Sequence, residues 1–330
     1  MDRLLSAVIG CGHISGRHLD ALAENEKCEI AAVCDIDKTR ADAKAEKYGA
    51  KAFYHIDDLL EWGKFDVLHI CTPHYLHAPM AISAMNKGKH VLCEKPLAIS
   101  YSDALRMCEC AEKNNVYLGT CFQNRYNPAS LYIKNMLESG ELGNVTAVKG
   151  MVTWSRDENY YNADDWHGTL RKEGGGVVIN QSIHTIDLMQ WFAGSDIESV
   201  SGSVSQKKLA GKVETEDTAD ARIVFKNGVS AVFYATLGYA VNSPVFLEII
   251  CEKGRIVSYD DLTVYRDGQE NSAMTFAKTV GDNSYWGSGH KLLIDDFYDS
   301  ILCGKDFQLC GKEGMKAVRI VDSLYSDARK

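Results

Sequence analysis

The first 121 residues alternate short apolar runs with amphipathic stretches. Apolar runs without polar gaps predict strands that are buried on both faces, and strands that alternate with helical patterns predict a parallel sheet. We therefore expect an α/β fold with a doubly wound parallel sheet in this part of the chain. The predicted strands are 4–9, 29–34, 65–71, 90–93 and 116–121, and the predicted helices follow Gly16 and cover 38–48, 78–87 and 102–114.

The pattern changes after residue 122, where strand signals follow one another without helices between them. Two alternating runs, 219–225 and 229–237, flank Lys226-Asn227-Gly228, which is a strong signal for a β-hairpin. This predicts an α+β domain with an open, mainly antiparallel sheet, one face of which must be covered by helices or by another subunit. We expect the first domain at 1–122 and the second at 123–330, with further helices at 128–139, about 177–193, about 290–303 and 312–328.

A glycine-rich turn joins the first predicted strand to the first predicted helix. Gly10 allows the tight turn, and Gly12 lets the backbone approach a pyrophosphate at the amino end of the helix. Ser15 stands at the third position of this dinucleotide-binding fingerprint, where a small residue packs between helix and strand, and Gly16 follows it. The context of strand, glycine turn and helix predicts a dinucleotide site.

The second predicted strand ends in an acid, Asp35, about 25 residues after Gly10. A carboxylate there accepts hydrogen bonds from both ribose hydroxyls and repels a 2′-phosphate, which favours NAD over NADP. Lys38 and Arg40 lie just beyond, so NADP stays open as an alternative cofactor. The alternative reading of Asp35 is a residue of the turn at the strand end.

The predicted strand 90–93 ends in Glu94-Lys95-Pro96. Pro96 stops the strand, so two charged side chains are expected at the carboxyl edge of the sheet, where open α/β folds bind ligands. The plainer interpretation is a strand that ends in a solvated loop. A lysine in a ligand site can stabilise the negative charge that develops on an alcohol oxygen during oxidation.

Three glycines at 174–176 precede the predicted helix 177–193. On one continuous helix, Asn180, His184 and Asp187 would share a face. His184 is a candidate general base, because an unperturbed histidine changes charge near neutral pH. The alternative is a core histidine that is hydrogen-bonded to Asp187. Trp166 and His167 precede the glycines, and aromatic side chains with polar neighbours suit the binding of a sugar.

Composition narrows the class of protein. The chain has 330 residues, of which 45% are hydrophobic and 25% charged, with a formal net charge of −9 and no basic run. These values indicate a globular protein and argue against nucleic acid or an anionic membrane surface as the partner. Eleven scattered cysteines, an amino-terminal run too short for a signal peptide and the lack of an apolar span lead us to expect a cytoplasmic protein with reduced thiols.

Four segments of the chain resemble the glucose–fructose oxidoreductase / inositol dehydrogenase (GFO/IDH/MocA) family. They are GCGHIS at 10–15, the strand that ends in Asp35, CTPHYLH at 71–77 and GKHVLCEKP at 88–96. The resemblance implies an amino-terminal Rossmann domain, NAD(P)-dependent chemistry and a homodimer or homotetramer formed through the carboxy-terminal sheet. The family places a catalytic histidine in a GGG…H..D segment, which His184 matches. Its sugar and inositol dehydrogenases often carry Asp where this chain has Asn180, and relatives often show Arg where His167 stands.

These residues and the resemblance together assign roles. The expected catalytic residues are Lys95 and His184. The residues expected to bind the cofactor are Gly10, Gly12, His13, Ile14, Asp35, Thr72, Pro73, His77, Glu94, Lys95 and Gln123. Those expected to bind the substrate are Lys95, Tyr126, Trp166, His167, Asn180 and His184.

The predicted function is oxidation of a secondary hydroxyl of a sugar, cyclitol or sugar derivative by hydride transfer to NAD, or the reverse reduction. Two alternatives keep the fold: a glycosidase or epimerase that retains NAD and oxidises transiently, and a non-catalytic NAD-binding sensor. No metal is expected, because the paired histidines have no carboxylate or thiolate partner at ligand spacing along the sequence. A serine hydrolase is not favoured, since a GxSxG elbow is absent from the sequence.

Overall fold

Two units, each with its own sheet, make up the chain. The computed structural model describes residues 3–268, 271–276 and 289–329. One unit contains the described residues of Met1–Gln123 and Ser288–Met315, and the other those of Asn124–Gly287 and Lys316–Lys330. The first unit thus includes α10 (Gly289–Cys303), which the sequence analysis placed in the second domain. The reason is packing, because α10 lies against α1 and buries Leu293, Ile294 and Phe297.

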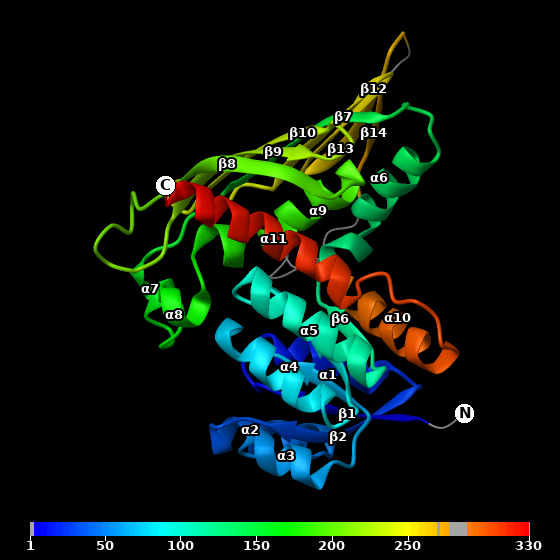
Figure 1. Cartoon of the computed structure of the whole chain (residues 1–330), viewed down its shortest axis with the longest axis vertical. Helices are drawn as coiled ribbons and strands as arrows, with labels where there is room; N and C mark the ends of the chain where they lie inside the picture. Colours follow the sequence, from blue (N-terminus) through cyan, green and yellow to red (C-terminus); the bar gives the residue numbers. More distant parts are fainter. Residues whose placement is uncertain (1–2, 269–270, 277–288, 330) are drawn as a thin grey trace. The chain divides into compact units, whose positions relative to one another are not determined.

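The first unit is built on a parallel sheet of six strands in the order β3-β2-β1-β4-β5-β6, which confirms the predicted doubly wound fold. The edge strand β3 was not predicted, because its three residues form no apolar run. Helices α4 and α5 lie side by side (Figure 1). The strands are β1 (Leu4–Ile9), β2 (Cys28–Cys34), β3 (Lys51–Phe53), β4 (Val67–Ile70), β5 (His90–Cys93) and β6 (Leu118–Thr120). The helices are α1 (Ser15–Glu24), α2 (Lys38–Tyr48), α3 (Ile56–Trp62), α4 (His77–Met85) and α5 (Tyr101–Asn114), together with α10.

The register of this sheet aligns the ends of its central strands. Ile9 at the end of β1 pairs with Cys34 of β2 and with Ile70 of β4, and Ile70 pairs with Cys93 of β5. The residues that follow these strands therefore lie side by side at one edge of the sheet. The strand order reverses between β1 and β4, which is where doubly wound sheets bind ligands.

The second unit holds an eight-stranded sheet in the order β14-β13-β12-β11-β7-β10-β9-β8. Neighbouring strands are antiparallel except for β7 and β10, and β9 and β10 form the predicted hairpin. The strands are β7 (Val145–Thr153), β8 (Ile197–Ser205), β9 (Thr218–Phe225), β10 (Ser230–Thr236), β11 (Phe246–Cys251), β12 (Gly254–Tyr259), β13 (Asp261–Arg266) and β14 (Ser272–Met274). The helices are α6 (Pro128–Glu138), α7 (Glu158–Tyr161), α8 (Leu170–Glu173) and α9 (Ile183–Ala193), and α11 (Gly311–Ala328) has residues in both units.

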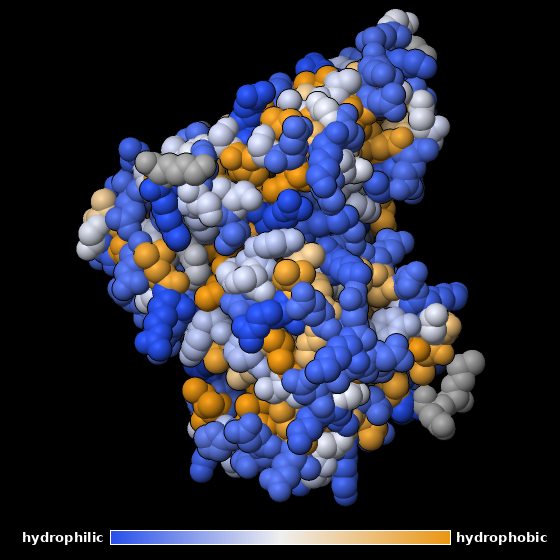
Figure 2. All heavy atoms as spheres, in the orientation of Figure 1, coloured by the Kyte–Doolittle hydropathy of each residue, from blue (hydrophilic) through white to orange (hydrophobic). Residues whose placement is uncertain are grey.

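Helix α9 covers one face of the second sheet, as the sequence required. It packs on β7, where a side chain at Gly150 would collide with Met189 Sδ, so the close approach depends on glycine. Alternate residues of β7 and β10, among them Met151, Val232 and Tyr234, are exposed. On the face of the molecule shown in Figure 2, hydrophobic residues form small groups among hydrophilic ones. Among the described residues, no helix is long and apolar enough to cross a membrane.

The predicted helix 177–193 is interrupted, which corrects the sequence analysis. A π-helical turn, Val177–Gln181, ends at Ser182, and α9 begins at Ile183. The buried carboxylate of Glu216 accepts hydrogen bonds from the backbone N–H groups of Gly176 and Val178 and from the Tyr325 hydroxyl. These bonds fix the amino end of the π-helical turn. Asn180 and His184 therefore lie on two different helical segments.

The buried histidines of the first unit make its stability depend on pH. Burial lowers the pKa of His69 well below its ordinary value of 6.5 and also lowers the pKa of His77. At pH values between the lowered and the ordinary pKa, the unfolded chain binds more protons than the folded chain, so the free energy of unfolding falls as the pH decreases below about 6.5. We predict a thermal midpoint, followed by circular dichroism, that drops between about pH 7.5 and about pH 5.5.

The His69→Gln variant should show a shallower drop, and His55→Gln, which changes an exposed histidine, should keep the wild-type slope. A His69→Gln slope as steep as that of the wild type would show that His69 contributes nothing to this dependence.

Candidate active site

The turn after β1 has the geometry of a phosphate-binding loop. Gly10 adopts φ +88°, and a Cβ there would lie 2.5 Å from the carbonyl oxygen of Cys71, so the position requires glycine. A Cβ at Gly12 would meet nothing within 4 Å among the described residues. Ser15 is fully buried and donates its hydroxyl to the Gly12 carbonyl oxygen. Helix α1 begins at Ser15 with Ile14 as its N-cap residue, and no side chain of the described residues caps it. Its first N–H groups suit an anionic ligand.

Asp35 connects the end of β2 to this turn. Its carboxylate accepts hydrogen bonds from the Cys11 backbone N–H at 2.6 Å and from the Asp37 N–H at 2.8 Å. The side chain is only partly buried. The predicted ribose-binding acid is therefore held beside the glycine turn, with the orientation of its carboxylate fixed.

The loops after β4 and β5 are braced by His77. Its Nδ1 lies 2.7 Å from the Pro96 carbonyl oxygen, and its Nε2 lies 2.8 Å from that of Thr72. Its side chain is fully buried and holds the carbonyl oxygens of Thr72 and Pro96 in place. That His77 also contacts the cofactor stays a prediction.

Glu94 is the most deeply buried charged group at this edge. Its Oε1 is 2.9 Å from His18 Nε2, and its Oε2 accepts the Lys95 backbone N–H at 3.1 Å. Burial by itself would raise the pKa of Glu94, but the hydrogen bond with His18 and the electrostatic interaction with His18 and with His290, whose Nε2 is 3.7 Å away, outweigh it and hold the pKa well below the ordinary value. Glu94 therefore stays ionised directly beside Lys95, which is itself partly buried.

On the side of its ring that faces away from Glu94, His18 continues into a chain of buried polar side chains. His18 Nδ1 is 2.8 Å from His69 Nδ1, and His69 Nε2 is 2.9 Å from the Tyr298 hydroxyl. That hydroxyl is 2.5 Å from Ser6 Oγ. Because burial lowers the pKa of His69, the chain passes through a neutral imidazole. It fixes the orientation of the His18 ring, and sequence reasoning gave it no role.

Cys121 adds a third potential metal ligand to His18 and Glu94. All three are buried, and their ligand atoms lie within 4.8 Å of one another. Sequence spacing missed this group, because Glu94 and Cys121 follow two different strands while His18 lies in α1. The distance of 2.9 Å between His18 and Glu94 is that of a hydrogen bond, so a metal ion would have to displace that bond.

In the second unit, Asp187 and Arg125 form a buried ion pair. The guanidinium donates two hydrogen bonds to the carboxylate, at 2.8 and 2.6 Å, and both side chains are buried. The alternative of a core His184 that is hydrogen-bonded to Asp187 stays a prediction beside that of a general base. Arg125 lies in the 3-10 turn Gln123–Tyr126, which carries two residues predicted to contact ligands.

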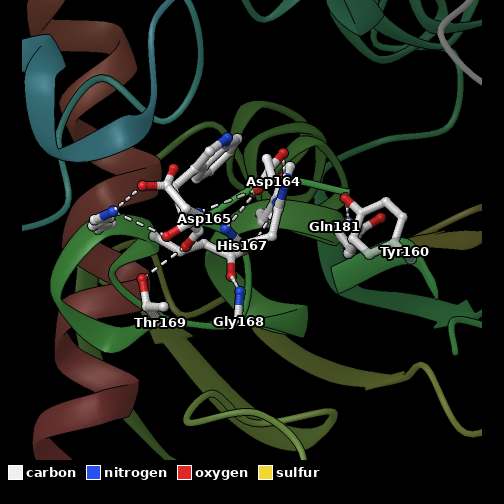
Figure 3. A network of polar contacts seen from close by, with 11 residues as sticks. Tyr160, Asp164, Asp165, His167, Gly168, Thr169 and Gln181 are labelled. Carbon is white, nitrogen blue, oxygen red and sulfur yellow. Dashed lines mark hydrogen bonds and ion pairs between the residues drawn. The ribbon is translucent and has the colours of Figure 1, made fainter. Parts of the chain in front are cut away.

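Residues 160–169, which we call the aromatic loop, carry the predicted substrate-binding residues Trp166 and His167 and are organised by Asp164 (Figure 3). Asp164 accepts hydrogen bonds from the backbone N–H groups of Trp166 and His167, and its Oδ2 is 2.7 Å from His167 Nδ1. The Trp166 and His167 rings lie with their centroids 3.7 Å apart. Gln181 donates to the Tyr160 hydroxyl at 2.7 Å. The structure thus connects the aromatic loop to the segment that carries Asn180.

Asn180 is buried, and its Nδ2 donates to Glu173 Oε1 at 2.6 Å. His184 lies in the first turn of α9 and is partly buried. Sequence reasoning missed Glu173, Glu216 and Arg125, because a charged residue next to a glycine run or a turn gives no sign of burial.

Comparisons with known proteins bear on both units. The model of the "oxidoreductase family, NAD-binding Rossmann fold" matches residues 4–122, and the model of the "GFO/IDH/MocA C-terminal domain" matches residues 130–257. Inositol 2-dehydrogenase of Salmonella paratyphi B is 33% identical over 203 residues, which cover 60% of this chain and 56% of the relative. The match therefore spans little more than half the length of that relative.

Two further matches cover more of the chain. Myo-inositol 2-dehydrogenase of Thermotoga maritima is 29% identical over 252 residues, covering 76% of this chain and 73% of the relative. The crystal structure of the WlbA dehydrogenase from Bordetella pertussis, in complex with NADH and UDP-GlcNAcA, superposes with a TM-score of 0.88 at 26% identity and covers 100% of this chain and 97% of that one.

The two glycines of the turn provide a matched test of the phosphate-binding geometry. Gly10→Ala should lower the thermal midpoint by several degrees, about 4 °C or more, because its Cβ meets the Cys71 carbonyl oxygen. Gly12→Ala should leave the midpoint unchanged but weaken NAD binding about tenfold, since its Cβ fills open space beside the helix terminus. Calorimetry of folding and of NAD binding measures both effects. Wild-type NAD affinity in Gly12→Ala would contradict the placement of the phosphates at this turn.

Proposed function

The chain belongs to the GFO/IDH/MocA family of oxidoreductases, and from this premise we propose that it is an NAD-dependent dehydrogenase of a sugar, cyclitol or sugar derivative. It oxidises a secondary hydroxyl to a ketone, or catalyses the reverse reduction. The observation that carries the proposal is the alignment of four strand ends, which sets Gly10, Asp35, Thr72 and Glu94 side by side at the switch point of the first sheet. Lys95 follows Glu94 at the same edge.

The chemistry assigns complementary roles to two residues. Nicotinamide, when bound, accepts the hydride from the carbon that carries the hydroxyl. His184 takes the hydroxyl proton as general base. Lys95 holds the same oxygen and stabilises the negative charge that develops on it.

Glu94 supports Lys95 in this mechanism. Its carboxylate is ionised, accepts the Lys95 backbone N–H and is held by His18. The hydrogen bond to its backbone N–H holds Lys95 at the strand end, and the ammonium form of the side chain is the one that stabilises an alkoxide. The buried side chains of His69 and Tyr298, which are linked to His18 by hydrogen bonds, make this arrangement rigid.

The cofactor is NAD, as the family description and the NADH-containing relative indicate. For discrimination against NADP we propose Asp35, because a fixed carboxylate beside the glycine turn repels a 2′-phosphate. For the substrate, the relatives named as inositol dehydrogenases and the WlbA complex with UDP-GlcNAcA support a polyol, a sugar or a sugar derivative.

We also propose that the exposed face of the second sheet pairs subunits into a homodimer or homotetramer. Met151 and Val232 are 41% and 56% exposed on the central strands β7 and β10, and Tyr234 lies opposite Met151 in the register. An apolar group on the uncovered face of a sheet is a common subunit contact.

Substitution of the two catalytic candidates tests the function. In a screen of polyols and sugars with NAD, Lys95→Ala and His184→Ala should each lower kcat/KM by about 100-fold or more, while the Kd for NAD stays within a few fold of the wild type. The controls are Lys87→Ala and His55→Ala, which change exposed residues of the first unit. Turnover is followed as the absorbance of NADH.

Full activity in both catalytic variants would overturn the assignment. Product without accumulated NADH would favour a glycosidase or epimerase that oxidises transiently. Tight NAD binding with no turnover of any compound in the screen would favour the non-catalytic sensor.

A further inference from the structure

We propose that Glu173 is a positioning residue that ties the aromatic loop, residues 160–169, to Asn180 and makes Asn180 present its carbonyl oxygen to the substrate. The inference rests on the proposed function and adds to it a rule of specificity. At this position the site accepts a hydrogen bond, so it selects a substrate with a free hydroxyl there over one whose oxygen is alkylated or absent.

One buried carboxylate makes both connections. Glu173 is 1% exposed, its Oε1 accepts from Asn180 Nδ2 at 2.6 Å, and its Oε2 accepts from the Gly168 backbone N–H at 2.5 Å. Gly168 has φ +75°, and a Cβ there would lie 2.9 Å from Val213 Cγ1, so the loop reaches Glu173 through a turn that requires glycine. The loop with Trp166 and His167 and the segment with Asn180 are therefore both held by this carboxylate, in addition to the hydrogen bond from Gln181 to Tyr160.

The carboxylate also determines which way the Asn180 amide faces. Both oxygens of Glu173 accept hydrogen bonds, one from Asn180 Nδ2 and one from the Gly168 N–H, whereas a side-chain amide has one donating end and one accepting end. The NH₂ group must therefore face Glu173, and Oδ1 must face away from it. The reversed amide would place two acceptors in contact in a buried place, which is unfavourable.

The backbone under Asn180 is held by other groups. Glu216 binds the N–H groups of Gly176 and Val178, and the Asn180 N–H donates to the Gly176 carbonyl oxygen. A change at Glu173 should thus alter the orientation of the amide and the tether to the loop and leave the π-helical turn in place. This separates a positioning role from a general role in folding.

The first experiment compares Glu173→Gln with the wild type on the best substrate of the screen. Glutamine keeps the shape but offers both a donor and an acceptor, so the amide of Asn180 can reverse. We expect kcat/KM to fall about tenfold, mainly through a higher KM, with the thermal midpoint little changed. The discrimination against the O-methyl or deoxy analogue of the substrate hydroxyl that Asn180 contacts should shrink.

The matched control is Lys172→Ala. Lys172 binds the carbonyl oxygen and the carboxylate of Asp165, so it is a second tether of the same loop that does not reach Asn180. Its loss should leave the discrimination unchanged. An equal loss of discrimination in Lys172→Ala and Glu173→Gln would show that the loop tether acts and the orientation of the amide does not.

The second experiment needs no activity. Asn180→Asp places a carboxylate against that of Glu173, so the variant should melt at a lower temperature at about pH 8 than at about pH 6, the reverse of the expected wild-type trend. The double variant Asn180→Asp/Glu173→Gln should recover stability at the higher pH, because the introduced glutamine amide can donate to the introduced carboxylate. Additive effects of the two substitutions on the free energy of unfolding would overturn the contact.

The two experiments separate the two claims. No turnover in the wild type, together with strong coupling in the stability cycle, would reject the proposed function and keep the Glu173–Asn180 contact. Turnover in the wild type with unchanged KM and discrimination in Glu173→Gln would keep the function and reject the positioning role.

Discussion

A parallel sheet that is buried on both faces can present its chemistry only where its strands end. In this chain that constraint decides the placement of Gly10, Asp35, Thr72 and Glu94, because the register brings their four strands to one edge. Among these four residues, Glu94 is the one that carries a buried carboxylate. A carboxylate that is 5% exposed must be compensated, and His18, supported by His69 and Tyr298, provides the compensation. The rigid strand end that results carries Lys95.

The second unit also orients its segments through buried acidic side chains, although burial raises the pKa of Glu216, whereas the pKa of Glu94 is held low. Glu216 holds the start of the π-helical turn, Glu173 holds Asn180 and the aromatic loop, and Asp187 binds Arg125. Each carboxylate accepts at least two hydrogen bonds, so each is a fixed point from which a neighbouring side chain is oriented. The residues proposed to bind the substrate are thus held in place by buried acidic side chains.

Sequence patterns predicted the parts of the fold that depend on local periodicity. The apolar runs predicted five of the strands of the first sheet, and Lys226-Asn227-Gly228 predicted the hairpin of the second. Three residues of β3 at a sheet edge were too few to leave a pattern. The π-helical turn before Ser182 was not predicted, because the carboxylate that holds its amino end belongs to Glu216, 38 residues beyond Val178.

The residues of the candidate site also divide into those that the sequence predicted and those that it did not. Gly10, Gly12, Asp35 and Lys95 were predicted because each has a fixed place relative to a strand end. His18 and Arg125 were not, because each belongs to a buried polar pair formed by two distant parts of the chain. Glu173 was not, because a charged residue before a glycine run gives no sign that it is buried. Asn180 was identified as a departure from the family pattern, and only the structure showed that a carboxylate, Glu173, stands directly behind it.

The central claim is that hydride passes from a substrate carbon to NAD on this chain. The most direct measurement uses the best substrate of the screen with deuterium at the carbon that is oxidised, followed by mass spectrometry of the reduced cofactor. The account predicts NADH that carries one deuterium and an equal amount of the ketone. Reduced cofactor without deuterium, or a ketone formed from a substrate that keeps its deuterium, would contradict it.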